Sequence, residues 1–92
     1  MSVTQRIRVA ERITRELIEA DFEIAFNLID LSQAELEQGE RASAARALQD
    51  AQDVVDDIER RLTLIGDLKS EPFSPLVGEL KRQTTLAKSQ LA

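Results

Sequence analysis

Residues 7–36, IRVAERITRELIEADFEIAFNLIDLSQAEL, decide the fold of this chain. Apolar side chains recur there at every third or fourth position, and only an α-helix places such positions on one face. This first stripe consists of Ile7, Ala10, Ile13, Leu17, Ala20, Ile24, Leu28, Leu31 and Ala34. No proline interrupts it, and Ser2 with Gln5 fits a capping box at its start. We therefore predict one long helix over about residues 3–38.

The residues that follow predict a second helix folded back on the first. Gly39 can adopt the left-handed conformation that ends a helix. Helical spacing then resumes over about residues 40–66, with Ala44, Leu48, Ala51, Val55, Ile58, Leu62 and Ile65 as its apolar face. Two long helices joined by so short a turn form an antiparallel hairpin.

A third, shorter helix is predicted over about residues 75–90. Between Gly66 and Ser74 we expect a loop, and Ser74-Pro75 is typical of a helix start, with Ser as the N-cap and Pro in the first turn. The third helix should cover only the open end of the hairpin, whether its own or that of a neighbouring chain. The fold class is thus all-α: a single domain over 1–92, built as an antiparallel three-helix bundle.

The composition excludes several kinds of chemistry. With no Cys and no His, the chain has no disulfide, no thiolate or imidazole metal ligand and no histidine base, so we expect no metal and no cofactor. The first residues show no apolar signal segment, and no stretch approaches the ~20 apolar residues of a membrane span. We expect a cytoplasmic protein without a membrane partner.

Charge is distributed unevenly around a net value of −5. Residues 1–18 carry four Arg and two Glu, residues 19–59 carry twelve acids against two Arg, and residues 60–92 carry six bases against three acids. The overall negative charge disfavours nucleic acid as a partner. The segregated signs favour self-association in which the acidic middle of one chain meets the basic ends of another.

The first predicted helix has apolar residues to spare. A second stripe, formed by Ile18, Phe22, Ala25, Phe26 and Ile29, runs beside the first. One stripe can face the second helix while the other faces the third helix or another chain. The candidate interface is Ile18, Phe22, Phe26, Ile29 and Leu36.

One carboxylate, Asp21, falls inside the apolar arc of the first helix. Because a lone buried carboxylate costs several kcal/mol, we expect it to pair with a base. The hairpin register brings Arg61 and Arg82 into reach, and Arg60 and Lys81 are further candidates. We predict a buried ion pair of Asp21 with Arg61 or Arg82. An alternative is a small internal polar site around Asp21 with Thr14 and Thr84.

Residues 28–56 resemble a single tetratricopeptide-type helical hairpin. The resemblance is carried by Leu28, Leu31, Ser32, Gly39, Ala44, Leu48 and Ala51. Glu35 and Asp56 depart from that family's pattern, which has a large apolar residue and a proline there. The resemblance implies a hairpin that binds a peptide or another helix.

These observations favour a helical protein–protein interaction module that self-associates through the long helix. No residue is a candidate for catalysis, because a single acid without a neighbouring nucleophile or base is not an active site. We therefore expect the protein not to be an enzyme. The alternative function is a ligand-binding or regulatory subunit that uses the polar site around Asp21.

Overall fold

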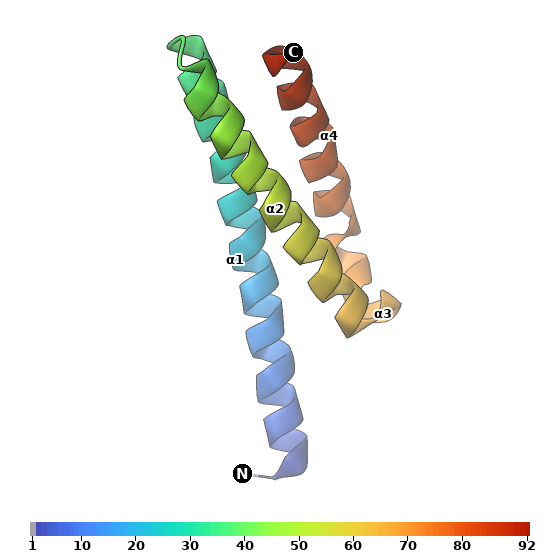
Figure 1. The fold of residues 1–92 in the computed structure, drawn as a ribbon. Coiled ribbons are helices and arrows are strands. Elements are labelled where there is room, and N and C mark those ends of the chain that lie inside the picture. The colour runs from blue at the N-terminus through green and yellow to red at the C-terminus, as the bar shows by residue number, and fades with distance from the viewer. Residues whose placement is uncertain (1) are drawn as a thin grey trace.

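The computed structural model describes residues 2–92 and confirms the all-α, antiparallel three-helix architecture. The elements are α1 (Val3–Glu37), α2 (Arg41–Ile65), the one-turn α3 (Asp67–Ser70), the 3-10 helix η1 (Glu71–Phe73) and α4 (Ser74–Leu91). Figure 1 shows α1 and α4 running in the same direction, with α2 running in the opposite one. Within this single chain, α4 packs on both α1 and α2 of its own hairpin.

Helix α1 is a single uninterrupted helix with a capped start. The Ser2 hydroxyl accepts a hydrogen bond from the Gln5 N–H at 3.1 Å, and the Gln5 side-chain oxygen accepts one from the Ser2 N–H at 3.0 Å. Gly39, with φ +80°, turns the chain back after the helix ends. At 1.5 Å per residue, 35 residues span about 52 Å. Helix α1 thus accounts for nearly all of the molecule's 55 Å length.

The turn end of the hairpin is packed through small side chains. Ala44, Ala47 and Ala51 of α2 are buried, and the buried Ser32 hydroxyl donates to the Ala44 carbonyl oxygen at 2.7 Å. Alanine and serine at these positions let two helix backbones approach closely. This contact lies within residues 28–56.

The expected loop between Gly66 and Ser74 is wrong, because that segment is almost wholly helical. Gly66, with φ +88°, ends α2, and α3 and η1 then continue directly into α4. Phe73 already has helical dihedral angles, so Ser74 lies inside the helix and does not cap it. Pro72 and Pro75 permit this because a proline in the first turn of a helix removes no intrahelical hydrogen bond.

Helix α4 also reaches further than predicted. It extends along α2 to the hairpin turn, where the Arg41 guanidinium donates to the Leu91 carbonyl oxygen at 2.6 Å. Lys81 pairs with Glu59 at 2.6 Å, and Lys88 donates to Gln52 at 3.1 Å, as antiparallel packing requires. In contrast, the N-terminal part of α1 projects beyond the other helices (Figure 1).

The core is aliphatic and lies where α1, α2 and α4 meet. Its buried members are Ile18, Phe22, Ala25, Ile29, Leu48, Ala51, Val55, Ile58, Phe73, Leu80 and Ala87. Phe22 stacks on Phe73, with ring centroids 5.9 Å apart and an interplanar angle of 15°. This stack ties the middle of α1 to η1, directly before α4, and so fixes which face of α1 is turned inward.

Candidate interaction surface

The predicted interface residues lie mainly in the core, so that assignment is wrong. Ile18, Phe22 and Ile29 are buried, and Phe26 and Leu36 are half-buried. The reason is that α2 and α4 both pack on the same side of α1 and together cover the second stripe. With its two phenylalanines, this stripe supplies the larger side chains for a core that three helices share. The second stripe therefore belongs to the fold and not to a partner.

The first stripe faces solvent along most of α1, although Leu28 packs partly against the core. Ile13, Leu17, Ile24 and Leu31 are each 47–49 % exposed, and Val3 and Ile7 are more exposed still. We call these six large side chains the α1 seam. The near-constant exposure from Ile13 to Leu31 shows that α2 and α4 leave this line open to solvent, while Ile7 borders the cleft beside the end of α2. A continuous apolar surface of this kind is typical of a site that packs against another helix or protein.

The spacing of the seam matches that of paired helices. Val3, Ala10, Leu17, Ile24 and Leu31 recur at intervals of seven residues, with further apolar residues between them. A seven-residue repeat keeps one apolar line facing a partner helix when two helices wind around each other with a left-handed twist. The repeat continues through five positions, so a matching helix could stay in contact along all of α1.

Acidic residues border the seam on one side with the same spacing. Glu16, Glu23, Asp30 and Glu37 also recur every seven residues, and all four are exposed. None of them forms an ion pair among residues 2–92. Charged side chains in this position flank the apolar line of paired helices and determine which partner and orientation are tolerated.

Asp21 lies on α1 between the two stripes, and Arg61 of α2 reaches it. The Arg61 Nη1 atom is 2.8 Å from Asp21 Oδ2, and the Asp21 and Arg61 side chains are 20 % and 38 % exposed. The pair is thus partly rather than fully buried. It joins α1 to α2 and leaves Asp21 charge-balanced within the hairpin.

Arg82, the other predicted partner, is engaged elsewhere on α4. It donates to both carboxylate oxygens of Glu79, one turn earlier, at 2.5 and 3.0 Å. Hydrogen bonds from Arg82 and then from Gln83 lower the pKa of Glu79 to about 2. Residues three positions apart are neighbours on a helix surface, so Arg82 and Glu79 pair locally.

The alternative polar site around Asp21 is not assembled. The Thr14 hydroxyl donates to the Ala10 carbonyl oxygen at 3.0 Å, and the buried Thr84 hydroxyl donates to the Leu80 carbonyl oxygen at 2.7 Å. Both side chains thus satisfy their hydrogen bonds within their own helices. No group of three or more potential metal-binding side chains occurs in the described part of the chain.

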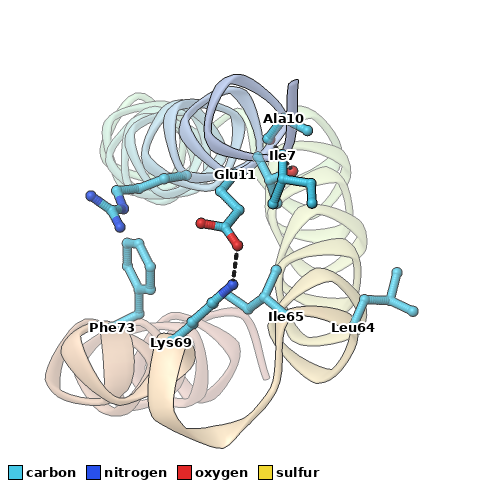
Figure 2. Close-up of a pocket in the computed structure, with 9 residues that line it drawn as sticks. Ile7, Ala10, Glu11, Leu64, Ile65, Lys69 and Phe73 are labelled. Atoms are coloured by element: carbon cyan, nitrogen blue, oxygen red, sulfur yellow. Dashed lines mark hydrogen bonds and ion pairs between the residues drawn. The ribbon is translucent and has the colours of Figure 1, made fainter. Parts of the chain in front are cut away.

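A cleft opens where α1 projects past the end of α2. It has a volume of about 330 Å³ and an apolar lining that includes Ile7, Ile65 and Phe73. Figure 2 shows the Glu11 carboxylate of α1 meeting the Lys69 ammonium of α3 across this space. The hydrogen bond and the charge of Lys69 lower the pKa of Glu11. This ion pair links the projecting part of α1 to α3.

Sequence reasoning missed the α1 seam as the exposed surface, although two signals could have found it. One is the seven-residue repeat from Val3 to Leu31, and the other is the matching row of acids from Glu16 to Glu37. A stripe that faces the core would not require a seven-residue repeat or a row of acids, because α2 and α4 pack on it.

Comparison with known proteins identifies no relative of this chain. No protein-family model matches the chain, and no curated protein or solved structure shows a significant match. Among residues 2–92, none of the helices combines the length and the apolar character needed to cross a membrane.

Proposed function

We propose that this protein is a helical interaction module that pairs with a second copy of itself through the α1 seam. The observation that carries the proposal is the line of six large aliphatic side chains, each about half exposed or more, along a 35-residue helix. A helix with a seven-residue apolar repeat packs best on another helix with the same repeat. A second copy of the chain supplies such a helix.

The energetics favour a reversible dimer. Covering the exposed half of one large aliphatic side chain contributes about 1 kcal/mol. Twelve such side chains in two copies therefore contribute on the order of 10 kcal/mol, while association itself costs about 4–15 kcal/mol. These opposing quantities are of similar size, so we expect an equilibrium between monomer and dimer rather than a permanent assembly.

The proposal includes neither catalysis nor nucleic-acid binding. Asp21 is paired with Arg61, and the two hydroxyl candidates, Thr14 and Thr84, donate to their own helices. The seam is bordered by acids, which would repel a phosphate backbone. We place the module in the cytoplasm, the setting that a chain without cysteine favours.

Charge substitution within the seam tests this function. The double variant Leu17→Glu/Ile24→Glu puts two charges into the proposed contact at sites that already meet water, so the monomer should still fold. The matched control is Leu68→Glu, which changes a leucine that is 88 % exposed and lies outside the seam. Sedimentation velocity over a concentration series should show a dimer for the wild type and the control and a monomer for the double variant. Equal sedimentation of all three proteins would contradict the proposal.

A further inference from the structure

Helix α1 carries opposite charges at its two ends. Between Val3 and Leu17 it has four arginines and two glutamates, for a net charge of +2. Between Ile18 and Glu37 it has six acids and no base, for a net charge of −6. In addition, Oε2 of Glu35 is buried and has no hydrogen-bond partner among the described residues. The acidic half thus holds negative charge that the chain itself neutralises only at Asp21.

We propose that the two copies pair with their α1 helices antiparallel, so that the basic half of each lies on the acidic half of the other. This inference rests on the proposed self-association. A parallel pair would set six acids against six acids and bring the positive ends of both helix dipoles together. An antiparallel pair replaces both repulsions with attraction. Because charges separated by more than about 8–10 Å are screened at ordinary salt, the halves in direct contact decide the orientation.

The seven-residue repeat also defines the register. Leu17 of one copy lies over Ala20 of the second copy, Ile24 lies over Ile13, and Val3 lies over Ala34. Leu17 thus meets a small side chain near the centre and Val3 meets one at each end, as close helix packing favours. A shift of seven residues in either direction would leave either Val3 or Leu31 without a partner. In the end-to-end register every seam residue lies level with α1 of the second copy, with Leu31 opposite Arg6 and Ile7 level with Asp30.

Arg6 gives this register a charged contact at each end. It is exposed, lies one residue before Ile7 of the seam, and takes part in no ion pair among residues 2–92. In the antiparallel register it comes opposite Leu31 and beside Asp30 of the second copy. Asp30 is one of the four acids that border the seam. In a parallel pair, Arg6 would meet Arg6.

Distances between spin labels test the orientation directly. The chain has no cysteine, so Thr4→Cys and Gln38→Cys each introduce one labelling site at an exposed position outside the seam. In the antiparallel register, two Thr4 labels lie about 45 Å apart, since 29 residues of helix separate their levels. In a mixture of the two labelled proteins, a Thr4 label and a Gln38 label lie within about 20 Å. Labelled proteins should first be shown to retain the wild-type mass.

Each result bears on a different proposal. A long Thr4–Thr4 distance together with a short Thr4–Gln38 distance supports the antiparallel register. A dimer with a short Thr4–Thr4 distance overturns the orientation and leaves self-association intact. A dimer in which both distances are long overturns the register. A monomer at every concentration overturns the proposed function, and the orientation with it.

Discussion

The second stripe and the α1 seam lie on the same helix and are both apolar, yet the first is mostly buried and the second faces water. The second stripe sits in the C-terminal half of α1, where α2 and α4 both pack, and Phe22 stacks there on Phe73. The seam begins at Val3, ten residues or more before the covered part, and runs to Leu31. Leu17, Ile24 and Leu31 lie beside this covered part and are still 47–48 % exposed, because they occupy a different face of α1. An apolar line on a face that the returning helices leave open indicates a partner outside the hairpin.

The largest expected effect is a difference in stability between two truncations, one in the second stripe and one in the α1 seam. Ile29 is fully buried, so Ile29→Ala should lower the free energy of unfolding by about 2–4 kcal/mol through lost burial and a cavity. Ile24→Ala, in the seam, should cost less than about 1 kcal/mol in the monomer. Urea unfolding at low protein concentration measures both values. Equal losses would show that the seam contributes to the core of the single chain.

The Asp21–Arg61 pair, between the two stripes, should contribute less to the free energy of unfolding than Ile29 does. A double-mutant cycle with Asp21→Ala and Arg61→Ala should give a coupling free energy of about 1 kcal/mol, because the pair is partly shielded from water. The control cycle uses Asp57 and Arg60, which form an exposed pair on α2 at 3.0 Å. That pair should give only a few tenths of a kcal/mol. A control coupling as large as the first would argue against a role for burial.

The smallest effect on stability is expected at the Glu11–Lys69 pair, in the projecting part of α1. Because Lys69 lowers the pKa of Glu11, the variant Lys69→Met should raise that pKa toward its ordinary value of 4.5. The ion pair stabilises the fold above the unfolded pKa, and this contribution is lost as pH falls through the lower, folded pKa. NMR titration of the Glu11 carboxyl measures the change, with Lys88→Met as the control. If the pKa of Glu11 is unchanged in Lys69→Met, the contact between Lys69 of α3 and Glu11 of α1 does not form in solution.

Local signals in the sequence were sufficient for the helices themselves. The capping box at Ser2 and Gln5 and the left-handed Gly39 are both present, and the long helices begin and end within about two residues of the predicted positions. These features depend on a few neighbouring residues, so sequence spacing reveals them. The Asp21–Arg61 contact could also be predicted from the sequence, because a tight turn fixes the hairpin register.

Contacts between distant segments were harder to predict. The face of α1 that turns inward depends on α2 and α4 fitting it together, and the Phe22–Phe73 stack that fixes this choice joins residues 51 positions apart in the chain. The helical path from Gly66 to Ser74 likewise depends on how that segment packs, since its glycine, serine and prolines suit a loop equally well. That path sets the course of α4, which was expected to stop short of the hairpin turn. Both errors concern packing rather than periodicity.

Light scattering of the wild-type protein at two salt concentrations tests the central claim most directly. The mass at low NaCl and high protein concentration should be twice the 10.3 kDa of one chain. Raising NaCl to about 0.5 M should shift the equilibrium toward monomer, because salt screens the attraction between the opposite halves of α1. A mass of 10.3 kDa at every protein concentration and both salt concentrations would contradict the account.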